Sequence, residues 1–146
     1  MPEPGRRIVE QELRQGGHAL PWVDLAAFAR RAIALAAADR AIPDGRGGWV
    51  FFDRGLVDAA VALQHAGGAA AVCTLRHGAR YHRQVFMTPP WPEIFAADAE
   101  RRHGLADAIG EYHRLLAAYR ALGYETVLLP KVGVVERADF VLRHLR

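Results

Sequence analysis

Short apolar runs and helix-like spacings alternate along this chain. The runs 49–52, 84–87 and 126–129 are each flanked by Pro, Gly or charged residues. Continuous apolar runs of this length are typical of parallel strands that are buried on both faces. Apolar residues recur every three or four positions over 25–35, before the first run, and over 105–122, between the second and third, as on one face of a helix. The pattern therefore predicts strands that alternate with helices.

Further helices are predicted at both ends, over 7–15 and 135–145, and Gly123 is expected to end the helix over 105–122. Alternating helices and strands predict an α/β fold, with a parallel sheet flanked by helices and sites at the carboxyl ends of the strands. The loops 53–55, 88–92 and 130–133 are therefore of most interest. Residues 1–146 are expected to form a single domain, because neither side of the Gly- and Pro-rich loop 43–48 could close a core alone.

Composition narrows the class of protein. With 146 residues, of which 51% are hydrophobic and 24% charged, the chain is typical of a soluble globular domain. Its longest apolar stretch free of charge, 66–75, is far shorter than the ~20 residues that a membrane helix needs. The N-terminus has no apolar segment typical of a signal peptide, and Cys73 has no second cysteine with which to form a disulfide. We therefore expect a cytoplasmic protein.

Asp53 and Arg54 directly follow the apolar run 49–52. A carboxylate at the end of a strand can hold Mg²⁺, directly or through water, and a neighbouring guanidinium can bind phosphate. The alternative for Asp53 is a helix N-cap or a turn. Asp58, one turn further on, is more simply explained as an acid in the first turn of a helix.

Glu3 lies in the segment Pro-Glu-Pro-Gly-Arg-Arg, which resembles the end of a strand that turns into a helix. Glu3 is a candidate general base for a substrate hydroxyl, or a second carboxylate near the metal. The alternative is a frayed terminus.

Arg101 and Arg102 open the long helical pattern after a Pro-rich loop. They are candidates for a lid that neutralises charge on a transferring phosphoryl group, and the alternative is a solvated helix start. Arg76, Arg80 and Arg83 rank below them.

The remaining chemistry in the sequence is less specific. The seven histidines and the single cysteine show no tight pair typical of zinc sites. The net charge of +3 is spread along the chain, so nucleic-acid binding is the least favoured function. Trp91, between prolines, is expected to pack in the core rather than against a substrate.

Several of these segments in order resemble a known family: Pro-Glu-Pro-Gly-Arg-Arg, Phe-Phe-Asp-Arg-Gly-Leu-Val-Asp, Arg-Tyr-His-Arg-Gln-Val-Phe, Pro-Pro-Trp-Pro-Glu-Ile-Phe and Asp-Ala-Glu-Arg-Arg. The family is the NadR-type AAA ATPases, small bacterial proteins, and the resemblance covers nearly the whole chain. It implies a three-layer P-loop NTPase fold of the nucleoside and nucleotide kinase type, with ATP and Mg²⁺ as ligands.

The resemblance also implies roles for particular residues. Asp53 would be the metal-binding acid and Arg54 its phosphate-contacting neighbour. Glu3 would lie beside the phosphoryl acceptor, while Arg101 and Arg102 would fall in the lid. The segment Lys131, Val132 and Gly133 would lie where the adenine ring rests.

The sequence departs from this family at its start. Family members begin with a strand and a Gly-x-x-Gly-x-Gly-Lys-Thr type loop, whereas the only lysine here is Lys131. We therefore expect a truncated domain whose first, central strand is missing and whose natural start lies upstream of Met1. Such a chain is expected to be inactive as it stands.

Three functions remain open at this stage. The first is an ATPase, or a kinase for a small nucleoside-like metabolite. The second is a non-enzymatic remnant that acts as a binding or regulatory module, completed by a partner or by self-association through unpaired strand edges. The third is nucleic-acid binding, which ranks last.

Overall fold

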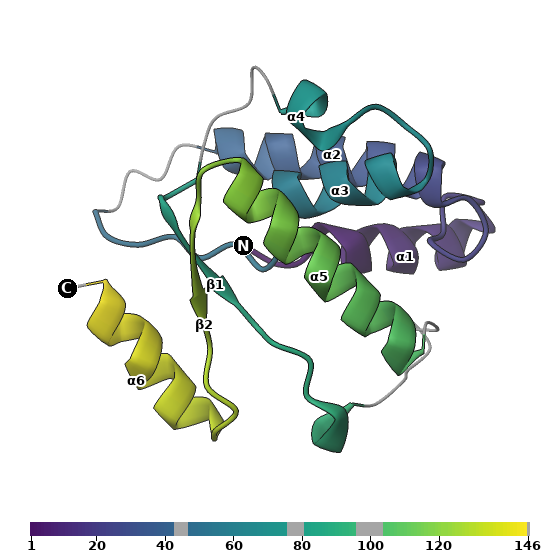
Figure 1. The fold of residues 1–146 in the computed structure, drawn as a ribbon. Helices are drawn as coiled ribbons and strands as arrows, with labels where there is room; N and C mark the ends of the chain where they lie inside the picture. The colour runs from purple at the N-terminus through teal and green to yellow at the C-terminus, as the bar shows by residue number, and fades with distance from the viewer. Residues whose placement is uncertain (43–46, 76–80, 96–103, 146) are drawn as a thin grey trace. The chain divides into compact units, whose positions relative to one another are not determined.

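The computed structural model describes residues 1–42, 47–75, 81–95 and 104–145. Its contacts divide the chain into two compact units (Figure 1). The helical unit contains the described residues 1–42 and 47–75, and the strand unit contains the described residues 81–95 and 104–145.

The helical unit is built from α1 (Pro4–Gln15), α2 (Leu25–Ala41), α3 (Leu56–His65) and the short α4 (Ala71–Thr74). α2 packs against both α1 and α3, and α4 packs against α3. Small residues allow this close packing, because the core around Ile8 is completed by Ala32 of α2 and Ala59 of α3. The helices predicted over 7–15 and 25–35 are confirmed, and both extend further than predicted.

Two buried carboxylates join α1 to α2. Asp39 accepts a hydrogen bond of 2.7 Å from Arg7, and Glu12 forms an ion pair with Arg31. Glu12 also accepts a 2.8 Å hydrogen bond from the backbone N–H of Ala19, in the loop between the helices. Only 6% of each acidic residue is exposed. Because buried charge is costly unless it is paired, these contacts fix how α1 and α2 meet.

The strand unit holds a parallel pair, β1 (Gln84–Met87) and β2 (Glu125–Leu128), seen side by side in Figure 1. The strand predicted over 84–87 is confirmed, and the one predicted over 126–129 begins and ends one residue earlier. α5 (Leu105–Ala121) contacts β2, while His144 of α6 (Val134–His144) lies edge-on to Phe86 of β1 at 6.0 Å. A 3-10 turn, Pro92–Ile94, follows β1.

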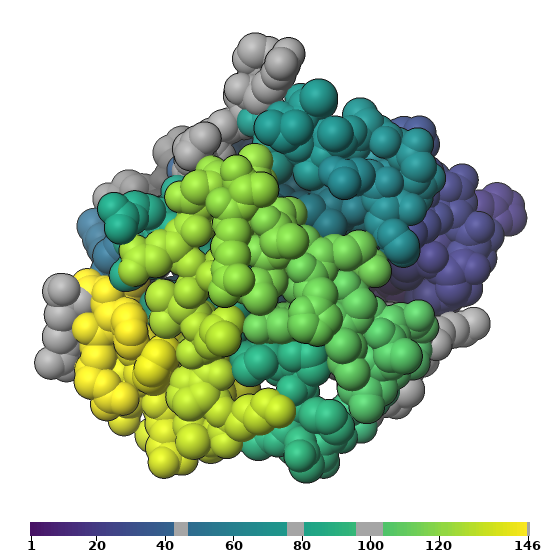
Figure 2. Space-filling view, in the orientation of Figure 1, coloured from purple at the N-terminus to yellow at the C-terminus, as the bar shows by residue number. Residues whose placement is uncertain are grey.

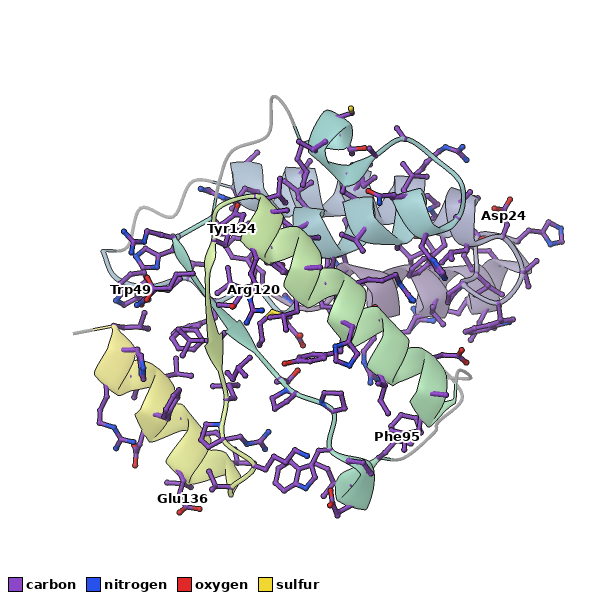
Figure 3. The ribbon with its side chains drawn as sticks, in the orientation of Figure 1. Asp24, Trp49, Phe95, Arg120, Tyr124 and Glu136 are labelled. Atoms are coloured by element: carbon purple, nitrogen blue, oxygen red, sulfur yellow. The ribbon has the colours of Figure 1, made fainter. Side chains whose placement is uncertain are left out.

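The helix α5 ends as predicted at Gly123. This residue has a φ of 82°, in the left-handed region that glycine adopts at little cost. The next N–H, of Tyr124, donates to the Tyr119 carbonyl at 3.0 Å, which closes the last turn of the helix. The rings of these two tyrosines also meet edge to face at 5.5 Å. The turn from α5 into β2 is therefore fixed by both backbone and side chains, and Tyr124 and Arg120 mark it in Figure 3.

The remaining predicted strand, 49–52, does not form a strand. Instead, the Met1 amino group donates to the Phe51 carbonyl, and the Asp53 N–H donates to the Met1 carbonyl at 3.2 Å. In a parallel pair, a residue on one strand forms backbone hydrogen bonds with the two residues that flank its partner on the other strand. Met1 forms this pattern with the residues on either side of Phe52. The prediction was wrong because this pairing is limited to a single residue, too short for a ladder. The described sheet therefore has two strands, and a missing central strand stays a prediction.

Exposed apolar side chains occur in both units. Trp49 and Phe51 are each about half exposed, and Val134 and Val135 of α6 are 72% and 73% exposed. The yellow surface of α6 is visible in Figure 2. Among the helices that the structure describes, none combines the length and the apolar character needed to cross a bilayer.

Candidate functional site

The candidate site lies in the helical unit, where the start of the chain meets the end of the 49–52 segment. The two backbone hydrogen bonds of Met1 hold these segments together. Glu3 then directly precedes α1, whose first residue is Pro4, and the loop Asp53-Arg54-Gly55 directly precedes α3. The segments that directly precede α1 and α3 therefore meet at one place.

Glu3 lies between two arginines. Its Oε2 accepts a hydrogen bond from Nε of Arg6 at 3.2 Å, and its Oε1 forms an ion pair with Nε of Arg54 at 3.3 Å. The Glu3 side chain is only 18% exposed, whereas those of Arg6 and Arg54 are 43% and 41% exposed. The expectation of a frayed terminus at Glu3 is therefore wrong, because distant residues hold its carboxylate. The structure brings Glu3 and Arg54 together.

Arg54 has an unusual backbone conformation. Its φ is 61°, and it is the one described residue other than glycine with a positive φ. The left-handed region costs a non-glycine residue roughly 1 kcal/mol or more, so it persists where surrounding contacts require it. Here those contacts include Glu3 on one side and the start of α3 on the other.

The start of α3 is capped by Asp58. The Gly55 N–H, which is buried, donates to Oδ2 of Asp58 at 3.0 Å. Asp58 is therefore a first-turn acid with a capping role, as its simpler interpretation predicted. Gly55, and not Asp53, is the N-cap residue of α3, so the N-cap alternative for Asp53 is wrong.

Asp53 leaves its carboxylate exposed at the end of the loop. Its backbone N–H donates to the Met1 carbonyl, and its side chain is exposed. In the described residues, no group of three or more His, Cys, Asp or Glu side chains is placed to hold a metal. Mg²⁺ differs from zinc in this respect, because it keeps several water ligands and needs only one or two carboxylates. The chemistry of Asp53, with Arg54 beside it for a phosphate, therefore fits a hydrated Mg²⁺ that arrives with a nucleotide.

The other predicted site residues either lie outside the described residues or belong to the strand unit. Arg101 and Arg102, with Arg76 and Arg80, lie outside the described residues. Lys131, Val132 and Gly133 belong to the strand unit and follow β2. There, Lys131 is exposed, Val132 is partly buried, and the Gly133 N–H donates to Oε2 of Glu136 at 3.1 Å. Glu136 lies at the start of α6 in Figure 3.

Two residues with distinctive contacts were missed by the sequence analysis. Arg6 is a partner of Glu3, and the spacing of three residues at a helix start is a signal that could have found it. Arg137 of α6 places its guanidinium carbon 5.7 Å from the centre of the Trp91 ring, a cation–π contact. No sequence spacing links these two residues, because Trp91 lies in the loop after β1 and Arg137 lies in α6.

Comparison with known proteins gives one family. The model of an AAA domain family matches residues 1–137, which takes in both units and every predicted site residue. No curated protein and no solved structure matches the chain. The family match agrees with the parallel β1–β2 pair and its flanking helices, and with an α/β fold of the P-loop-like type. The chain belongs to the AAA domain family.

Proposed function

We propose that this chain is a nucleotide-binding domain of the P-loop NTPase and kinase-like type, with ATP and Mg²⁺ as its ligands. The observation that carries the proposal is the Asp53-Arg54 pair at the end of its loop, with Glu3 paired to Arg54 at 3.3 Å, in a chain of the AAA family. An exposed carboxylate next to a held guanidinium suits a metal and a phosphate bound side by side. The match to one family across both units also supports our proposal that residues 1–146 act as one domain.

In this proposal, each candidate residue has a distinct task. Asp53 holds the hydrated Mg²⁺, and Arg54 contacts a phosphate. The resemblance assigns the adenine ring to Lys131, Val132 and Gly133, and the phosphates to Arg101 and Arg102. Bound Mg²⁺ would neutralise phosphate charge, as it does in phosphoryl transfer generally.

The finer assignment is to the NadR-type group, with ATP hydrolysis or phosphoryl transfer to a small nucleoside-like metabolite. For the 146 residues alone we expect binding without turnover. They contain no Gly-rich loop followed by Lys, and phosphoryl transfer depends on the electrostatic positioning that such a loop provides.

The direct test is calorimetry with Mg-ATP on the chain and on matched variants. We expect Asp53→Asn and Arg54→Gln each to weaken binding by about tenfold or more, since charge-assisted contacts contribute roughly 1.5 to 3 kcal/mol. Asp139→Asn and Arg14→Gln are the controls, because both residues are exposed and Arg14 is bound only to Glu10 within the described part of α1. Equal losses in site and control variants would contradict the proposal.

A longer chain that includes the in-frame residues upstream of Met1 provides a second arm of this experiment. Binding by the longer chain alone would place the phosphate contacts mainly in the added residues. If neither chain binds Mg-ATP, the proposed function falls.

The exposed apolar residues favour a second candidate, a binding module completed by a partner or by self-association. Trp49, Val50 and Phe51 are 49%, 39% and 51% exposed, in consecutive positions of one unit. Consecutive exposed apolar residues are unusual unless another surface covers them. Sedimentation at increasing concentration tests this, with Phe51→Ser expected to reduce any association. A chain that stays monomeric, or associates equally well with Phe51→Ser, would exclude self-association through this segment.

A further inference from the structure

The contacts of Glu3 point to a site with two arginines. We propose that Arg6 and Arg54 together bind a phosphoryl oxyanion, and that Glu3 is a positioning residue that aligns both guanidinium groups. The proposal rests on the proposed function, since it concerns the phosphate side of the same site. It adds Arg6 as a ligand-binding residue and changes the role of Glu3 from a general base to a positioning group.

The geometry around Glu3 fits a positioning role. Each Glu3 oxygen contacts the Nε atom of a different arginine, at 3.2 Å and 3.3 Å. A guanidinium group is planar and rigid, so fixing its Nε also fixes the direction in which its two Nη groups face. One carboxylate therefore orients two forks at once. Forks of this kind bind phosphate oxygens with two parallel N–H donors.

The charge and exposure of the three side chains support the same role. Two guanidinium groups that contact the same carboxylate repel each other, and the Glu3 carboxylate between them offsets that repulsion. The Arg6 and Arg54 side chains are about two-fifths exposed, whereas Glu3 is mostly covered. A ligand from solvent therefore meets the arginines before it meets the acid.

Glu3 is poorly placed to act as a catalytic base. A base must accept a proton from a substrate hydroxyl within hydrogen-bond distance. Both Glu3 oxygens already contact arginine nitrogens and the side chain is only 18% exposed, so little of the carboxylate is open to a substrate hydroxyl. The left-handed φ of 61° at Arg54 also shows that the site holds this residue in a costly conformation, as expected for a group that is kept aligned.

Asp53 determines which form of the ligand is favoured. Its exposed carboxylate directly precedes Arg54 in the sequence and repels an anion that approaches alone. A phosphoryl group that brings a divalent cation avoids this repulsion, because the cation can pair with Asp53. We therefore expect the site to prefer Mg-pyrophosphate to pyrophosphate.

The test is titration with pyrophosphate, with and without Mg²⁺, followed by calorimetry and by the NMR signals of the arginine Nε–H groups. We expect Arg6→Gln, Arg54→Gln and Glu3→Gln each to weaken binding of Mg-pyrophosphate by about tenfold, the loss of one charge-assisted contact. The Nε–H signals of Arg6 and Arg54 should shift on binding in the unmodified chain. In Glu3→Gln they should move toward the positions of exposed arginines before any ligand is added.

The chain provides a matched control on the same helix. Arg14 and Glu10 form an ion pair of 3.2 Å in α1, the same length as the Arg6–Glu3 pair, and both side chains are more exposed. Arg14→Gln and Glu10→Gln should leave pyrophosphate binding within about twofold of the unmodified chain, because exposed pairs contribute little. Circular dichroism of every variant checks that the helical unit is folded, and Glu3→Asp, which keeps the charge but shortens the side chain, serves if Glu3→Gln does not fold.

The outcomes separate this inference from the proposed function. If Glu3→Gln binds as well as or better than the unmodified chain, Glu3 competes with the ligand or is irrelevant, and the inference falls. If Arg54→Gln weakens binding of both Mg-pyrophosphate and Mg-ATP while Arg6→Gln and Glu3→Gln do not, the inference falls and the proposed function stands. If all three variants lose pyrophosphate binding while Mg-ATP does not bind at all, the inference stands and the proposed function falls. Failure of the unmodified chain to bind pyrophosphate would overturn the inference.

Discussion

Two loops in this chain have the same local design and different surroundings. Asp53-Arg54-Gly55 leads into α3, and Pro130-Lys131-Val132-Gly133 leads into α6. Each ends in a glycine whose N–H donates to an acid three residues on, Asp58 at 3.0 Å and Glu136 at 3.1 Å. Each also carries one basic residue, Arg54 or Lys131. By local sequence alone, both loops are equally good candidates for a phosphate site.

The difference lies in what the rest of the chain brings to each loop. Arg54 meets Glu3, which is distant in sequence, and Gly55 is buried. Lys131 and Gly133 are exposed, and Lys131 has no ion pair among the residues that the structure describes. A loop after a strand-like segment therefore becomes a convincing site only where a second segment holds its charged residue in place.

The largest expected difference between the loops is in their capping acids. Asp58→Ala leaves the buried Gly55 N–H without its acceptor, so we expect a loss of about 2 kcal/mol in the free energy of unfolding. Glu136→Ala should cost about 0.5 kcal/mol, because water can reach the exposed Gly133 N–H. Urea unfolding of the two variants measures both values. Equal losses would mean that burial does not distinguish the loops.

A smaller effect is expected from the backbone of Arg54. Arg54→Ala loses the ion pair with Glu3 and keeps the costly φ of 61°, whereas Arg54→Gly loses the pair and removes that cost. We expect the glycine variant to be about 1 kcal/mol more stable than the alanine variant, the usual penalty of the left-handed region. Thermal unfolding of the pair tests this, and a less stable glycine variant would show that the conformation is not strained.

The smallest effect is expected at Lys131. Lys131→Gln should change the free energy of unfolding by less than about 0.5 kcal/mol, because substitutions of exposed side chains usually have little effect. Its effect on Mg-ATP binding should also stay below that of Arg54→Gln. A larger loss of binding at Lys131 than at Arg54 would reverse the ranking of the two loops.

Much of the fold was predictable because the relevant information is local. The strand 84–87, the four helices predicted by periodicity and the glycine end of α5 all follow from spacing and from the properties of single residues. The segment 49–52 has the composition of a strand, but composition does not supply a neighbouring strand with which to form a ladder. Its failure to form a strand therefore could not be read from its own residues.

The site was predictable only in part, for the same reason. Glu3, Asp53 and Arg54 could be identified as chemically suitable residues, but their spacing did not predict the Glu3–Arg54 contact. The Glu3 carboxylate bridges two arginines because Met1 pairs with the backbone of residues 51–53. No sequence pattern predicts that pairing. The left-handed conformation of Arg54 could not be predicted either, since an arginine, unlike a glycine, gives no indication of a positive φ.

The parallel register of β1 and β2 has a consequence for the order of folding. Gln84 pairs with Glu125 across the whole of α5, so the strands cannot begin as a hairpin and must wait until a long loop has closed. In the helical unit, by contrast, α2 and α3 are neighbours in sequence as well as in space. Contacts between close neighbours form faster than distant ones. Pulsed hydrogen exchange should therefore find the amides of α2 and α3 protected before those of β2.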